Sequence, residues 1–177
     1  PSAPHKVSHS PSLDSLTILS FPGAQPVSFS EQSMESLKSD DFWVCEKSDG
    51  QRVLVLIMVP RTTMKQEVYL IDRKNNYHRV SGLYFPNQDL TCPKAKQNGG
   101  QRSDTLLDGE LVVDRAETSR TKSRLRLLLF DCIVLERENI ATLPLRDRYC
   151  RLLNQVYTPY TRHLKQTTCT TACLPFE

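Results

Sequence analysis

The sequence predicts one α+β domain built on an antiparallel sheet. Its 177 residues are 38% hydrophobic and 24% charged, a globular composition that can bury a core. Strand-like runs follow one another through links of hairpin length, which favours antiparallel pairing. The net charge of +3 permits a polyanionic partner without requiring one. No run is long and apolar enough to span a membrane, and the first residues lack the apolar core of a secretion signal.

The N-terminal stretch divides into an arm and the start of the domain. Residues 1–20 are rich in Ser and Pro and lack periodicity, so we expect a disordered arm. The domain is expected to span residues 21–177. Within it, Ser28 to Lys38 predicts a short helix, because Ser28 and Glu31 have capping-box spacing.

A series of apolar runs predicts the sheet, and an amphipathic run follows it. Lys74-Asn75-Asn76 predicts a hairpin turn, whereas residues 86–103 and 115–123 are polar and predict long loops. Behind Pro144, residues 145–157 predict an amphipathic helix. The expected strands are residues 42–47, 52–59, 67–73, 77–80, 105–113 and 125–135.

The cysteines predict reduced thiols, because no secretion signal places the chain in an oxidising compartment. Cys169 and Cys173 have only His163 nearby, too few ligands for a zinc site, so metal binding there is disfavoured. The six positions are 45, 92, 132, 150, 169 and 173.

The stretch Lys47-Ser48-Asp49-Gly50-Gln51-Arg52 carries the first chemical hypothesis. It joins two apolar runs and predicts a strand, a tight turn and a second strand. A lysine held there is a fixed amine, and a nearby arginine favours its neutral form and can hold an anion. This arrangement suits attack on phosphorus. The alternative is an ordinary hairpin with an Asp-Gly turn, which has the same local sequence.

Asp108-Gly109-Glu110 places two acids inside an apolar run. Carboxylates at i and i+2 of a strand point to the same face. Burying them is costly unless they meet cations, a metal or hydroxyl groups. The alternative is a turn between two short strands, with Glu110 solvated.

Two further stretches add candidate ligand-binding side chains. Phe130 and Asp131 end an aliphatic run, where an open ring could stack on a base and the acid could bind polar groups beside it. The alternative for Phe130 is an ordinary core position. Arg73 could clamp a phosphate, or it could form a surface pair with Asp72 on a hairpin.

Together and in this order, the stretches resemble the covalent nucleotidyltransferase superfamily, which comprises mRNA capping guanylyltransferases and ATP-dependent DNA and RNA ligases. Lys47 to Arg52 match the motif Lys-x-Asp-Gly-x-Arg, and the later motifs match at Asp108-Gly109-Glu110 and Phe130-Asp131. Ser48 is close to the Thr usual in capping enzymes, where ligases commonly carry an aromatic residue. Residues 21–29 and 68–76 look like segments of the fungal capping domain, and the resemblance covers residues 21–165.

This resemblance implies an mRNA guanylyltransferase that acts in the nucleus. Lys47 would take GMP from GTP and pass it to the 5′-diphosphate end of RNA, with Mg²⁺ or Mn²⁺ as cofactor. Arg52 and Glu110 would hold the ribose hydroxyls, Phe130 would stack on guanine, and Arg73 would reach the phosphates. Asp49 would orient Lys47 or lie near the metal, whose ligands are unassigned.

The resemblance also implies partners and missing parts. The phosphatase signature of bifunctional metazoan capping enzymes is absent, which favours a separate RNA triphosphatase subunit, and the RNA polymerase II C-terminal tail is a further expected partner. The family's last strands and OB-fold domain would lie beyond Glu177, so we expect a truncated domain. Two alternatives stay open, namely an ATP-dependent polynucleotide ligase and a non-catalytic fragment that acts as a binding module.

Overall fold

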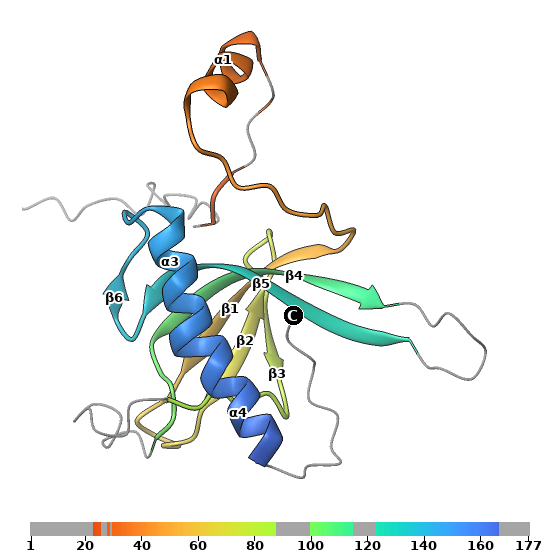
Figure 1. The fold of residues 1–177 in the computed structure, drawn as a ribbon. Coiled ribbons are helices and arrows are strands. Elements are labelled where there is room, and N and C mark those ends of the chain that lie inside the picture. The colour runs from red at the N-terminus through yellow and green to blue at the C-terminus, as the bar shows by residue number, and fades with distance from the viewer. Residues whose placement is uncertain (1–22, 26–27, 29, 88–99, 115–122, 167–177) are drawn as a thin grey trace, which may run out of the picture.

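The predicted antiparallel α+β architecture is confirmed. The computed structural model describes residues 23–25, 28, 30–87, 100–114 and 123–166. Within them, six antiparallel strands form one sheet in the order β3-β2-β1-β4-β5-β6 (Figure 1). The strands are β1 Gln51–Met58, β2 Glu67–Ile71, β3 Tyr77–Val80, β4 Thr105–Asp114, β5 Arg124–Leu135 and β6 Glu138–Asn139.

A continuous helical run crosses one face of this sheet. It comprises α3 Leu145–Arg151, the π-helix η1 Leu152–Tyr157 and α4 Thr158–Gln166 (Figure 1). Alternate β1 residues share one face of the strand, and those facing the run enter the core. This core includes Val53, Val55 and Ile57 of β1, together with Val156 and Tyr160 of the helical run.

The helical run is longer than the sequence predicts, because it continues through Pro159. A proline has no N–H, so the carbonyl four residues earlier loses its usual helical donor. Here that carbonyl belongs to Gln155, and it accepts a hydrogen bond from the Arg102 guanidinium. Arg102 is 1% exposed and also contacts Glu136, with Nη1 2.9 Å from Oε1. A buried arginine from outside the helix thus supplies the donor that Pro159 lacks.

The predicted strand over residues 42–47 is wrong. These residues have no regular secondary structure, and residues 54–57 of β1 are already paired on both edges, with β2 and with β4. The segment is instead exposed, with Val44 96% accessible. Trp43 turns its ring against Tyr149 of α3, with the ring centroids 5.4 Å apart. An apolar run therefore lies at the surface, because most of the β1 residues that a hairpin would place opposite it are already paired on both sides.

The first helix, α1, spans Glu31–Ser39 and begins later than predicted. Its N-cap is Ser30 rather than Ser28, and the capping box pairs Ser30 with Ser33 instead of Glu31. Each serine hydroxyl accepts from the other residue's backbone N–H at 3.3 Å. Two serines therefore form the capping box at the start of α1, where the sequence predicts a serine and a glutamate.

The predicted turn at residues 74–76 is confirmed, although β2 ends at Ile71 rather than at Arg73.

Cys45, Cys132 and Cys150 are free thiols. No helix in the described part of the chain is long and apolar enough to cross a membrane. The predicted arm at residues 1–20, most of both predicted loops, and Cys92, Cys169 and Cys173 lie outside the described residues.

Candidate active site

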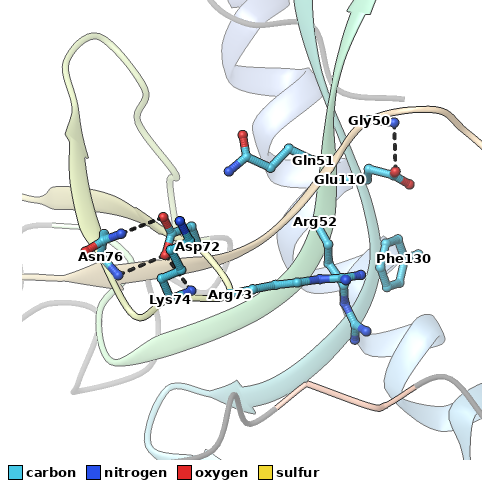
Figure 2. Close-up of a pocket in the computed structure, with 9 residues that line it drawn as sticks. All are labelled: Gly50, Gln51, Arg52, Asp72, Arg73, Lys74, Asn76, Glu110 and Phe130. Atoms are coloured by element: carbon cyan, nitrogen blue, oxygen red, sulfur yellow. Dashed lines mark hydrogen bonds between the residues drawn. The ribbon is translucent and has the colours of Figure 1, made fainter.

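A cavity of about 540 Å³ opens beside the start of β1. It is lined by the beginning of β1, the β2–β3 turn, one residue of β4 and one of β5 (Figure 2). Four of the predicted site residues, Arg52, Arg73, Glu110 and Phe130, therefore meet in one place. Lys47 and Asp49 are not among the lining residues, which are Gly50, Gln51, Arg52, Asp72, Arg73, Lys74, Asn76, Glu110 and Phe130.

Arg52 is held in the cavity wall by Asp108. Its Nε donates to Asp108 Oδ1 at 3.0 Å, and Nη2 donates to Oδ2. The Asp108 carboxylate is 1% exposed, so the guanidinium is the cation that makes its burial tolerable. The hydrogen bond to Asp108 raises the pKa of Arg52 despite partial burial. Arg52 is therefore fixed in the cavity wall as one half of an ion pair.

Glu110 lies next to Arg52 because the two residues are paired in the β1–β4 register. Its Oε1 accepts from the Gly50 backbone N–H at 2.9 Å, and Oε2 accepts from the Ser48 hydroxyl. β4 runs without interruption through Gly109, so the alternative of a turn with a solvated Glu110 is wrong. A side chain at Gly109 would lie 2.5 Å from the Leu128 carbonyl oxygen, which explains glycine in mid-strand.

Phe130 presents an open ring to the cavity. It is 40% exposed, which contradicts the alternative of a core phenylalanine. The guanidinium carbon of Arg52 lies 5.8 Å from the ring centroid, within the range of a cation–π contact. The ring is thus supported by a cation on one side and remains accessible for stacking.

Asp131, by contrast, does not serve the cavity, and the expectation that it binds polar groups near a base is wrong. Asp131 is buried and faces α3, whereas Phe130, the unpaired residue at the register shift between β4 and β5, is exposed to the cavity. Its two oxygens accept from Arg148 Nε and Nη2 of α3, both at 2.8 Å. These hydrogen bonds raise the pKa of Arg148. The sequence analysis did not identify Arg148. The only hint was Asp131, an acid inside an apolar run, which would need a nearby cation when buried.

The β2–β3 turn places two further cations, Arg73 and Lys74, at the cavity. The Asp72 carboxylate accepts from the Lys74 backbone N–H at 2.8 Å, and from the Asn76 backbone and side chain at 2.9 and 2.8 Å. These hydrogen bonds, above all the one from the Asn76 side-chain amide, hold the pKa of Asp72 below its ordinary value. Asp72 is thus occupied by the turn and does not pair with Arg73. Figure 2 shows the Arg73 side chain extending toward Arg52.

Lys47 lies outside the cavity in the irregular segment that leads into β1. Its side chain is 90% exposed, and Nζ lies 3.7 Å from Asp49 Oδ1. Both the predicted strand, turn and strand and the predicted fixed amine are therefore wrong, because residues 42–47 form no strand and the Lys47 side chain is solvated. The segment nevertheless reaches the cavity at its next residues, since Ser48 and Gly50 both bind Glu110.

No group of three His, Cys, Asp or Glu side chains in the described ranges could hold a metal ion. Mg²⁺ is commonly held by one or two carboxylates together with substrate phosphates.

Cations, an open aromatic ring and a carboxylate thus surround one cavity, a combination that can bind an anionic ligand that carries a ring. The chain belongs to the mRNA capping enzyme family, because residues 6–177 match the family model described as "mRNA capping enzyme, catalytic domain".

Fungal relatives support the same family. The mRNA-capping enzyme subunit alpha of Candida glabrata is 38% identical over 145 residues, covering 79% of this chain and 31% of the relative. The protein of the same name from Saccharomyces cerevisiae is 38% identical over 79% of this chain and 30% of its own length. The one from Schizosaccharomyces pombe is 42% identical over 66% of this chain and 27% of its own. The chain thus spans about 30% of the length of these relatives.

Proposed function

We propose that this chain provides the nucleotide-attachment site of an mRNA guanylyltransferase, acting in the nucleus. The observation that carries the proposal is the convergence of Arg52, Arg73, Glu110 and Phe130 on one cavity, beside the segment that contains Lys47. The family of the chain makes guanylyl transfer the reaction that best fits this cavity.

In the first proposed step, neutral Lys47 attacks GTP. The lone pair of Nζ forms a P–N bond to the α-phosphorus, and the bond from that phosphorus to the α–β bridging oxygen breaks. Pyrophosphate leaves with the electron pair of the broken bond. The lysine nitrogen, which becomes positively charged when the P–N bond forms, then loses one proton to solvent. The product is a phosphoramidate that links GMP to Lys47.

The cavity residues would bind the nucleotide around this reaction. Phe130 would stack on the base, and Arg52 and Glu110 would hold the ribose hydroxyls. Arg73 and the neighbouring Lys74 would face the phosphates, where a guanidinium can bind two oxygens at once. These cations would stabilise the charge that builds on phosphate oxygens in the transition state.

The proposal requires Lys47 to move. Its amine is exposed and outside the cavity lining, so the Lys47 side chain must turn toward the α-phosphate when GTP binds, while Ser48 and Gly50 keep their contacts with Glu110. Catalytic contacts commonly tighten only in the substrate complex. Asp49 stays with Lys47 and would orient its amine.

In the second proposed step, the lysine nitrogen becomes the leaving group. A terminal oxygen of the 5′-diphosphate RNA attacks the phosphoramidate phosphorus, the P–N bond breaks, and Lys47 regains a proton. A bound Mg²⁺ or Mn²⁺, held by phosphate oxygens and the exposed Asp49, would neutralise phosphate charge.

The names of the fungal relatives as alpha subunits indicate assemblies with further subunits in those proteins. For this protein we propose a separate RNA triphosphatase subunit and the RNA polymerase II C-terminal tail as partners.

The direct test is nucleotide attachment. The full-length protein is incubated with GTP or ATP labelled on the α-phosphate, denatured, and examined for bound label. We expect a GTP-dependent adduct that disappears when 5′-diphosphate RNA is added.

A second candidate function is an ATP-dependent polynucleotide ligase, because the exposed ring of Phe130 can stack on any base. A label from ATP alone would identify a polynucleotide ligase. A protein that attaches neither nucleotide would refute the catalytic proposal and favour a binding module.

A further inference from the structure

The carboxylate of Glu110 contacts the segment that carries the proposed nucleophile. Gly50 N–H donates to Oε1 at 2.9 Å, and the Ser48 hydroxyl donates to Oε2. These contacts join β4 to residues 60 and 62 positions earlier in the chain. The residue proposed to hold the ribose therefore also holds the segment next to Lys47.

One carboxylate can serve both purposes. An ionised carboxylate offers about four acceptor sites on its two oxygens. Ser48 and Gly50 use one site on each oxygen, which leaves about two sites for ribose hydroxyls. The segment and the nucleotide can thus be positioned against the same rigid strand at the same time.

Of the two contacts, the Ser48 hydroxyl is the one nearest Lys47. On the other side of Lys47, the first ring contact of the segment is that of Trp43 with Tyr149. Between these two anchors, Val44 is 96% exposed and the Lys47 side chain is 90% exposed. The placement of the lysine therefore depends on few contacts, and Ser48 supplies the adjacent one.

We propose that Ser48 is a positioning residue for Lys47. Its hydrogen bond to Glu110 sets the segment relative to the ribose, so that Lys47 approaches the α-phosphorus along a reproducible path. The inference rests on the proposed function. It assigns Ser48 an effect on the rate of nucleotide attachment and none on nucleotide binding, because Glu110 keeps its own place in β4 without the serine hydroxyl.

The test measures the rate of adduct formation in a single turnover as GTP concentration is varied. It uses the full-length protein and compares Ser48→Ala, Ser48→Thr and a matched control, Ser81→Ala, in the exposed turn after β3. We expect Ser48→Ala to lower the maximal rate about 10-fold, the effect of losing one charge-assisted hydrogen bond. Its GTP dissociation constant should stay within about twofold of the wild-type value, because positioning affects the reaction path and not binding. Ser48→Thr keeps a hydroxyl and should react like the wild type.

A double-mutant cycle adds a second criterion. Adding Ser48→Ala to Glu110→Ala should slow attachment no further, because the partner of the hydroxyl is already gone. Equal additional slowing in the Glu110→Ala background would overturn the inference.

Three other outcomes would also overturn it: an unchanged rate in Ser48→Ala, a loss confined to GTP affinity, or a thermal transition lowered along with the rate. Failure of Ser48→Thr to restore the rate would do the same. If wild-type protein forms no adduct with GTP, the proposed function itself fails. Normal wild-type labelling with an unaffected Ser48→Ala overturns the inference on Ser48 alone.

Discussion

At the scale of single residues, the site depends on which charges are neutralised by the protein and which remain available for a ligand. Arg52 is neutralised by buried Asp108, and Asp72 is occupied by the turn that it stabilises. Among the described residues, Arg73 and Lys74 form no ion pair and face the cavity. The cavity therefore keeps uncompensated positive charge where phosphates would bind.

Replacing Asp108 by Ala should destabilise the domain and reduce nucleotide attachment. The change leaves Arg52 partly buried without its counter-ion, which commonly costs about 3 kcal/mol or more. Asp114→Ala on the same strand is the control, since Asp114 pairs with Arg126 at the surface and its loss should cost less than about 1 kcal/mol. Urea unfolding measures both values. Equal stabilities for the two variants would contradict the structural role of Asp108.

Replacing Glu110 by Ala should reduce attachment of GMP without unfolding the domain. Glu110 lies on the cavity wall, where its removal takes away a ligand contact and relieves a desolvation cost. We expect a loss of about 100-fold in labelling, typical of removing one preorganised contact, with an unchanged thermal transition. Glu138→Ala, on exposed β6, is the control. Normal labelling of Glu110→Ala would exclude Glu110 from the site.

At the scale of elements, Arg148 fastens the helical run to the sheet. Its guanidinium joins α3 to Asp131 of β5 through two hydrogen bonds, and the two side chains are 16% and 11% exposed. Arg148→Ala should lower the free energy of unfolding by about 3 kcal/mol, because Asp131 would remain buried without its cation. Arg146→Ala, at an exposed position of the same helix, should change it by less than about 0.5 kcal/mol. A stable Arg148→Ala variant would show that core packing alone holds the helix.

The strands were predictable because their patterns are local. Alternation and turn residues placed β3 at its observed bounds, and they placed β1 within one residue at each end. The run at residues 42–47 has the same apolar composition, yet whether it pairs depends on a free sheet edge, which local sequence does not reveal. The helix through Pro159 likewise depends on Arg102, 57 positions earlier, whose hydrogen bond is set by the tertiary fold.

At the scale of the whole molecule, the order of motifs predicted the composition of the site better than its geometry. Arg52, Glu110 and Phe130 meet at one cavity because antiparallel pairing makes β1, β4 and β5 neighbours, and the β2–β3 turn adds Arg73. The position of Lys47 was not predictable, since it lies in a segment fixed by side-chain contacts rather than by strand pairing. The cavity is thus formed in this structure, whereas the exposed Lys47 would have to approach it for the proposed reaction.

The central claim is that Lys47 accepts the nucleotide, and mapping the attachment site tests it most directly. Full-length wild-type protein, Lys47→Arg and the control Lys38→Arg, on exposed α1, are incubated with α-phosphate-labelled GTP, digested, and analysed by mass spectrometry. We expect GMP on Lys47 in the wild type and in Lys38→Arg. Lys47→Arg should carry none, because arginine stays protonated and cannot act as the nucleophile. GMP on another residue, or undiminished labelling of Lys47→Arg, would contradict the account.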